Sequence, residues 1–472
     1  MKGDFTRVTF DPAKHYSGVL EQQGRMQVDS DRNEMNDIHR YFSRRLAADL
    51  IGPHGGPGDG FDIVLAKDEE DNEVLRDFGV KAGHYYVDGV LCENDGAVLY
   101  TNQSGSPLGL DNLEDGNRYL AYLDVWERHV TAYEDEDEYK IGIREVALRG
   151  PDTATRARVV WQVKARLVTD PDDNNMDDAN PDKAYSNFLT FLGDTKLGSG
   201  QLRARAIKPK ADDEPCLISP ESRYRGAENQ LYRVEIHHGG IGMPPDAAAN
   251  ANVDKTKVAT FKWSRENGSV IFPITHMEGN VVTLRDLGRE SRFGLRPNDW
   301  VEIVDDDYVL QNRAEPLLQI DTIERDSMRV TLKTTPAAQV GTDSTKHPLL
   351  RRWDQPSKAI MVVETAGDYD SDWIFTLEDG IQIQFSGAEQ SGGGGTPAPA
   401  SYRTGDYWLI PARVATGDVE WPGPPGIPQA RPPHGVEHGF APLRIFSIGV
   451  GGHVTLGTNL RRTINPLAKV VP

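Results

Sequence analysis

Most of this chain is a succession of short strand-like runs separated by turn-forming residues. The stretch GHYYVDGVLCEN predicts a hairpin, because an Asp88-Gly89 turn joins two short runs, residues 85–87 and 90–92. Runs such as NQLYRVEIHH, NVVTLRDL and DWVEIVDD follow, with turn residues between them. Short, regularly spaced strands are typical of small barrels and sandwiches. The sequence therefore predicts a mainly β fold with several small barrel-like or sandwich-like domains.

Turn residues also predict which neighbouring runs pair. The Asn-Gly pair at 267–268 and the Glu-Gly-Asn triplet at 278–280 are expected to connect paired strands. The Gly-rich segment 386–401 is expected to be a long hairpin loop, because the runs on both sides of it, IQIQFS and YRTGDYWLI, are strand-like. The C-terminal stretch APLRIFSIGVGGHVTLG predicts one last hairpin.

The N-terminal part of the chain follows a different period. An extended arm is expected up to Val28, and a single long helix, roughly 30 Å in length, is expected from Ser30 to Ile51. Ser30 is a suitable N-cap, and Gly52-Pro53 ends the helix. Apolar residues recur at spacings of three or four and share one helical face: Met35, Ile38, Phe42, Leu46 and Leu50.

The length of 472 residues suggests about three domains at roughly 150 residues each. We expect an arm and helix for assembly or attachment over residues 1–60 and a β domain over 61–168. An acidic loop with a short helix is expected over 169–200, and a barrel-like or sandwich-like domain over 201–345. A C-terminal β domain with the Gly/Pro-rich loop 386–401 completes the chain over 346–472.

Charge and composition limit the classes of partner. The formal net charge is −20 and the pI is near 5.1, so no nucleic-acid partner is expected. The two cysteines, Cys92 and Cys216, are expected to be small buried residues rather than a disulfide framework. No apolar run is long enough for a transmembrane helix, and the first ten residues lack the apolar stretch of a signal peptide. Synthesis in the cytoplasm is therefore expected.

No catalytic, metal or cofactor motif rises above background. GPHGGPGDG is Gly-rich but lacks the Lys-Ser/Thr of a phosphate-binding loop. His237 and His238 are neighbours on a predicted strand and should point to opposite faces, while Pro and Gly residues around His434 and His438 disfavour the helix that would align them. The acidic stretch 170–182 lacks the Gly and the Glu of an EF-hand loop, which leaves only adventitious calcium binding open. We expect no catalytic residue, no metal site and no cofactor.

Two interpretations of the tryptophan residues on the predicted strands stay open. Tryptophans anchor cores and subunit interfaces, and they also stack on sugars. The candidates for ligand stacking are Trp126, Trp300 and Trp408.

Several stretches together resemble a known family. They are MKGDFTRVTFDPAKHYSGVLEQQGRMQVDSDRNE, YLDVWERHVTAYED, REVALRGPDTATRARVVWQVK, YRGAENQLYRVEIH, FKWSRENGSVIF, RPNDWVEIVDD and YRTGDYWLIPAR. Over nearly its whole length the chain is similar to an uncharacterised structural protein family, DUF6519-like, that is associated with phage-tail-like contractile injection systems. It departs from that family at Ser30 and Arg32, where Ala and Trp are more common.

The resemblance implies a non-enzymatic structural subunit of a contractile particle, associated with its baseplate, spike or fibre. The expected partners are other subunits of the particle and further copies of the chain, with trimeric or hexameric symmetry, and the particle is either released or docked at a membrane. The alternatives are a receptor- or glycan-binding module of such a particle, a cap or plug component, or an envelope-degrading enzyme. The arm and helix should supply the interface through Met35, Ile38, Phe42, Leu46, Gln22, Gln23 and Arg25.

Overall fold

The computed structural model describes most of the chain, in two compact units that are each discontinuous in sequence. Unit 1 comprises Met1–Val8, His129–Arg156 and Leu197–Val436, and unit 2 comprises Thr9–Arg128, Ala157–Lys196 and Glu437–Pro472. The described residues are 1–68, 70, 72–103, 113–135, 142–150, 152–168, 176, 180–193, 198–207, 223–243, 254–288, 293–336, 340–365, 373–387, 399–424 and 427–465. The predicted calcium-like stretch, the centre of the Gly-rich loop and Cys216 lie outside these ranges for the most part.

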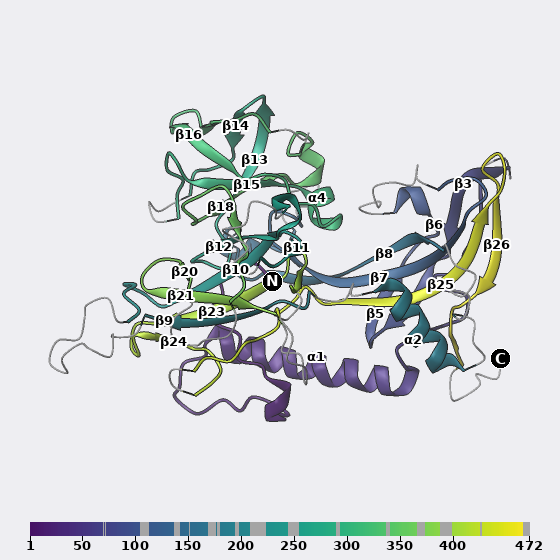
Figure 1. Ribbon diagram of the computed structural model, residues 1–472, viewed down its shortest axis with the longest axis horizontal. Coiled ribbons are helices and arrows are strands. Elements are labelled where there is room, and N and C mark those ends of the chain that lie inside the picture. The colour runs from purple at the N-terminus through teal and green to yellow at the C-terminus, as the bar shows by residue number, and fades with distance from the viewer. Residues whose placement is uncertain are drawn as a thin grey trace. The chain divides into compact units, whose positions relative to one another are not determined.

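Unit 2 is built on three sheets around one apolar core (Figure 1). Its four-stranded sheet has the order β26-β25-β7-β8, with strands Val454–Asn459, His438–Ile448, Arg118–Val130 and Arg156–Leu167. A second sheet, β27-β1-β4-β5, consists of Thr463–Ile464, His54–Pro57, Gly83–Val87 and Val90–Asn94. The third, β2-β3-β6, consists of Ile63–Lys67, Glu73–Val80 and Val98–Leu99. The predicted hairpins β4–β5 and β25–β26 are both confirmed.

Two helices complete unit 2. Helix α2 (Pro181–Leu192) begins where the Asn180 side chain accepts hydrogen bonds from two backbone amides, and it packs with Phe188 against the second face of the β7–β25 pair. Helix α1 (Asp29–Ile51) agrees with the predicted helix except at its start. Its N-cap is Val28, without a side-chain hydrogen bond, and Ser30 lies inside the first turn, where it is buried. The prediction of Ser30 as N-cap is therefore wrong by two positions.

Gly89 allows helix α1 to lie close to the β4–β5 hairpin, because it has no side chain at the point of contact. The Asp88-Gly89 turn has positive φ at both residues, 47° and 76°, as the sequence DG favours in a two-residue hairpin. A Cβ added to Gly89 would lie only 2.1 Å from the carbonyl oxygen of Arg44 in α1. The turn thus requires glycine both for its backbone conformation and for the close approach of the helix.

Unit 1 contains a two-sheet sandwich. One sheet has the order β19-β12-β10-β23-β24, with strands Ile360–Met361, Thr260–Ser264, Gln230–His238, Tyr407–Arg413 and Asp418–Val419. The other, β20-β21-β9, consists of Phe375–Thr376, Ile381–Ser386 and Gln201–Ala206. Their facing side chains form a single core that includes Val234, Phe261, Phe385 and Trp408. A small pair, β11 (Gly240–Ile241) and β22 (Ser401–Tyr402), adds to this unit.

A closed barrel is inserted into the sandwich between β12 and β19 (Figure 1). Its strand order is β13-β14-β17-β16-β15-β18, and every neighbouring pair is antiparallel. The strands are Ile271–Glu278, Val281–Leu284, Arg329–Leu332, Leu318–Glu324, Trp300–Val304 and Leu349–Trp353. Short helix α4 (Asp306–Leu310) follows β15. Short 3₁₀ turns elsewhere span Pro12–Lys14, Tyr100–Asn102, Val146–Leu148, Lys255–Lys257 and Ser344–Lys346.

The structure confirms a mainly β fold but changes two predicted pairings. The Asn267-Gly268 turn is present, yet the strands that it joins do not pair: β12 pairs with β10 and β19, and β13 pairs with β14 and β18. The runs on either side of the Gly-rich loop, β21 and β23, lie in the two facing sheets of the sandwich instead of forming a hairpin. At the Asn267-Gly268 turn, β12 joins the sandwich core and β13 joins the barrel core, whereas β21 and β23 face each other across the sandwich core.

The contiguous domains predicted from the sequence differ from the two units. The predicted boundaries at 60, 168, 200 and 345 follow changes in composition, whereas residues 1–8 group with unit 1 and residues 437–472 with unit 2. The long strands β7 and β25 pair over most of their length, which brings the C-terminal part of the chain into the sheet of unit 2.

The approach of helix α1 to the hairpin can be tested with Gly89→Ala. The positive φ alone should cost about 1–2 kcal/mol of unfolding free energy, and the short contact with Arg44 should add to it. Urea unfolding measures the loss, and hydrogen exchange should show faster exchange of α1 amides. Gly96→Ala is the matched control, since nothing lies within 4 Å of a Cβ there. Equal effects of the two variants would contradict this account of the turn.

Candidate functional site

Strand β10 carries an apolar and a polar face, and both are buried. Alternate side chains of a strand point to opposite faces, so Tyr232, Val234 and Ile236 enter the sandwich core. The intervening Arg233 and Glu235, each 2 % exposed, point to the other side of the sheet. We call the charged groups on that side the charged cluster: the partly exposed Lys2 and the buried Arg233, Glu235, Lys262 and Glu302.

Glu235 is the centre of the charged cluster. Its carboxylate lies 2.5 Å from Nε of Arg233, 2.9 Å from Nζ of Lys2 and 3.4 Å from Nζ of Lys262. Burial raises the pKa of Glu235, but the three cations outweigh burial and hold its pKa well below the ordinary value. The carboxylate is therefore charged at neutral pH, and each of its neighbours compensates part of the cost of burying it.

Lys262 connects the sandwich to the barrel. Its Nζ lies 2.7 Å from Glu302 Oε1 on β15 and 4.5 Å from the ring centre of Trp353 on β18. The indole Nε1 of Trp353 donates to the second carboxylate oxygen of Glu302 at 2.9 Å. Burial raises the pKa of Glu302, but Lys262 and its neighbours lower it to about 2. The ammonium group of Lys262 thus contacts Glu235 of the sandwich and Glu302 of the barrel.

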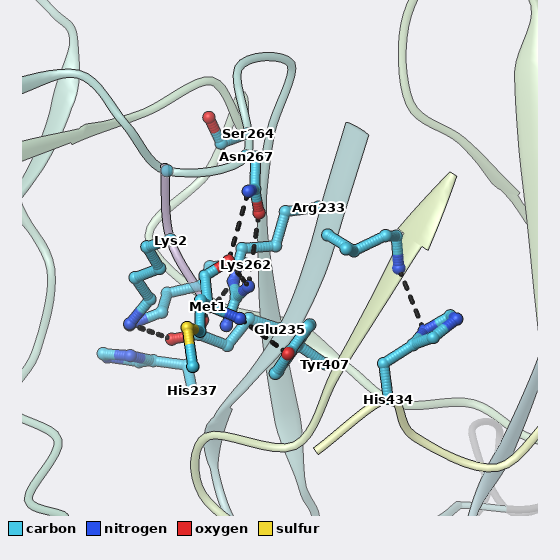
Figure 2. Close-up of polar contacts among 12 residues, drawn as sticks. Met1, Lys2, Arg233, Glu235, His237, Lys262, Ser264, Asn267, Tyr407 and His434 are labelled. Carbon is cyan, nitrogen blue, oxygen red and sulfur yellow. Dashed lines mark hydrogen bonds and ion pairs between the residues drawn. The ribbon is translucent and has the colours of Figure 1, made fainter. Parts of the chain in front are cut away.

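The first residues of the chain lie against Arg233, Glu235 and Asn267 (Figure 2). The carbonyl oxygen of Met1 accepts hydrogen bonds from Asn267 Nδ2 at 3.1 Å and from the Arg233 guanidinium Nη1 at 3.3 Å. The main-chain nitrogen of Met1 donates to Tyr407 Oη at 2.6 Å. Asn267 Nδ2 also donates to the carbonyl oxygen of Gly3 at 2.9 Å. Burial lowers the pKa of Lys2 to about 8, against the opposing effect of Glu235.

Two further contacts hold the same segment at the edge of the sheet. The guanidinium Nη1 of Arg7 lies 3.0 Å from Glu420 Oε1, and Nη2 of Arg413 donates to the carbonyl oxygen of Thr6 at 3.0 Å. We call residues 1–7 the anchor segment. Polar groups from β10, β23 and the turn at Asn267 hold this segment in one register along the sheet.

A comparison with known protein families identifies the chain. The model of a family described as "Family of unknown function (DUF6519)" matches residues 1–186 and 189–441, which include the anchor segment and the whole charged cluster. The chain belongs to the DUF6519 family. A search of curated proteins and a search of solved structures each found no match. The family assignment therefore brings no described activity with it.

In this DUF6519 protein the predicted interface residues of helix α1 fall on two sides. Ile38 is fully buried in this structure, and Met35 is partly buried. Phe42 is 50 % exposed and Leu46 is 62 % exposed, and Leu50, one turn further on, is 74 % exposed. The buried and partly buried residues of α1 mix apolar side chains with polar and small ones: Ser30, Glu34, Met35, Asp37, Ile38, Arg40, Arg44, Ala47, Ala48 and Ile51.

The predicted arm residues Gln22, Gln23 and Arg25 are all exposed. They belong to residues 11–28, which connect the anchor segment to helix α1 and which we call the tether. Leu20 and Met26 of the tether are 90 % and 88 % exposed. The tether makes few contacts with the described part of the chain, in contrast to the anchor segment, which is held in unit 1.

The three tryptophans predicted to stack on ligands differ in their surroundings. Trp408 is fully buried and donates from Nε1 to the carbonyl oxygen of Arg431, so no ring face is available to a ligand. Trp126 is 8 % exposed, with His438 stacked 5.1 Å away and Lys164 Nζ 5.7 Å from its ring centre. Trp300 on β15 is only partly exposed. Trp126 and Trp408 are thus buried in this structure, and ligand stacking stays a prediction.

The histidine pairs do not form a metal site in the described part of the chain. His237 and His238 were predicted to point to opposite faces of the strand, but their rings lie only 4.4 Å apart. Strand β10 has a register shift between Ile236 and His238. His434 and His438 are engaged separately, with Nδ1 of His434 accepting from the amide of Leu409 and Nδ1 of His438 lying 2.6 Å from Asp124. Among the described residues no group of three metal-binding side chains was found, and none of the helices described could span a membrane.

The pH dependence of unfolding tests whether Glu302 is ionised in the charged cluster. Its folded-state pKa is lowered, so its contribution is present above the unfolded value of 4.5 and is lost as the pH falls toward 2. The shift corresponds to about 3 kcal/mol in total, of which on the order of 1 kcal/mol should be lost by pH 3.5. Urea unfolding at pH 7 and pH 3.5 measures this loss.

Glu302→Gln should remove that part of the pH dependence, and at pH 7 it should cost about 3–5 kcal/mol because Lys262 loses its nearest carboxylate. Glu278→Gln, at an exposed carboxylate on the same barrel, is the matched control and should behave like the unchanged protein. If Glu302→Gln is equally destabilising at both pH values, the carboxylate is not ionised as described.

Proposed function

We propose that this protein is a non-enzymatic structural subunit of a phage-tail-like contractile particle, associated with its baseplate, spike or fibre. Helix α1 and the tether attach it to neighbouring subunits. The observation that carries the proposal is the row of apolar side chains on the outer side of α1: Phe42, Leu46 and Leu50 are exposed, although Ile38 of the same helix is buried. A helix on the surface of a globular domain ordinarily buries its apolar side.

The charge of the N-terminal region supports an assembly role. Residues 1–51 hold eight Lys or Arg and eight Asp or Glu, so this region is formally neutral in a chain of net charge −20. Like charges oppose association between acidic subunits, and a neutral region with exposed apolar side chains avoids that repulsion. The same region is therefore suited to contact between copies of this chain and contact with other subunits of a particle.

The anchor segment changes how the attachment is best tested. Deleting residues 1–51 would remove the groups that cover the charged cluster as well as the attachment helix, so a loss of assembly would have two explanations. Substitutions on the exposed side of α1 avoid this ambiguity. Exposed positions change stability by about 0.5 kcal/mol or less, and Gln has nearly the helix propensity of Leu.

The triple variant Phe42→Gln, Leu46→Gln, Leu50→Gln should fold normally but enter particles roughly tenfold less, since it loses three apolar side chains that a partner would bury. Particles from cells that express the variant in place of the original gene are isolated by sedimentation, and the subunit is quantified by immunoblot. Ser43→Gln, on the same exposed side of the helix, is the matched control. Incorporation of the triple variant at the control level would refute attachment through this side of α1.

A further inference from the structure

The contacts of the anchor segment can be made by any copy of the chain. They include the Lys2–Glu235 ion pair, hydrogen bonds to the carbonyl oxygens of Met1 and Gly3, the Arg7–Glu420 pair and the ring contact of Phe5 with His129. They are made with side chains of unit 1 that lie more than 100 positions away in the sequence. The connection to the segment's own chain therefore plays no part in them.

The tether leaves the anchor segment room to reach another copy. It begins after Thr9 and Phe10, which contact α1: Thr9 Oγ1 donates to Glu34 at 2.6 Å, and the ring of Phe10 lies 5.7 Å from that of Tyr41. The backbone hydrogen bonds found for described residues of the tether lie in local turns at 11–15 and 22–25 and at its end, where the Val28 carbonyl oxygen accepts from the Arg32 amide of α1. Its 18 residues span at most roughly 60 Å when extended.

We propose that in the assembled state the anchor segment of one copy occupies the site on unit 1 of a neighbouring copy. The exchange retains every contact of the anchor segment. It breaks the contacts of Thr9 and Phe10 with α1 and few contacts of the tether, so its cost is limited to those contacts. An empty site would leave Glu235 with one cation fewer and would uncover Asn267 and Tyr407, so a second anchor segment is its natural occupant. The inference rests on the proposed role in assembly but is tested on purified protein alone.

Crosslinking distinguishes exchange between copies from binding within one copy. Arg7 and Glu420 are suitable positions because both side chains are about 40 % exposed and meet at 3.0 Å. One full-length chain carries Arg7→Cys, the other carries Glu420→Cys, and both carry Cys216→Ser. The two are co-expressed so that exchange can occur during folding, and a short bismaleimide crosslinker is added. Each chain has only one of the two new cysteines, so a crosslink between positions 7 and 420 must join two copies.

The co-expressed pair should give about tenfold more dimeric crosslink than Arg7→Cys paired with Glu278→Cys, a ratio that corresponds to a preference of about 1.4 kcal/mol. Mass spectrometry of the crosslinked peptides identifies the joined positions. A single chain with both Arg7→Cys and Glu420→Cys shows that the crosslinker spans the pair. If that chain crosslinks within one copy while the mixed pair does not exceed the Glu278→Cys control, exchange is refuted. Reduced particle entry by the α1 variant would still support the proposed function in that case.

Discussion

The ionised carboxylate of Glu235 is the constraint on which unit 1 depends. Moving an unpaired charge from water into a protein interior costs several kcal/mol, so Glu235 can be buried only if cations surround it. Arg233 comes from the same strand and Lys262 from the next one, but Lys2 comes from the anchor segment. The N-terminal residues are thereby part of the fold of unit 1. Lys262 in turn needs Glu302, which connects the sandwich to the inserted barrel.

Local patterns in the sequence predicted local structure well. The Asp88-Gly89 hairpin, the last hairpin β25–β26 and helix α1 follow from turn chemistry or periodicity over a few residues. Pairing between distant segments was not predictable in the same way. The strands around Asn267-Gly268 separate because the sandwich and barrel cores each take one of them, and no residue near the turn encodes that choice.

The charged cluster left a signal in the sequence that could have been used. The run YRVEIHH alternates apolar and charged residues, which ordinarily indicates one buried and one exposed face. Burial of both faces follows from the barrel and the anchor segment, whose positions depend on residues far along the chain. For helix α1 the sequence predicted the helix and its apolar residues, but it did not predict that Ile38 would be buried while Phe42 and Leu46 stay exposed. The backbone of Arg44 approaches the hairpin at Gly89, a contact that depends on residues outside the helix.

The anchor segment and the outer side of α1 suit different parts of an assembly. Apolar contact is non-directional and grows with buried area, so Phe42, Leu46 and Leu50 can contribute affinity without fixing a register. Buried ion pairs add little net stability over apolar pairs, but they penalise any segment that does not present a cation to Glu235 and a carbonyl oxygen to Asn267. The buried pairs are also screened less by salt than exposed pairs. We therefore expect the outer side of α1 to determine how tightly subunits associate, and the anchor segment to determine which chains are accepted.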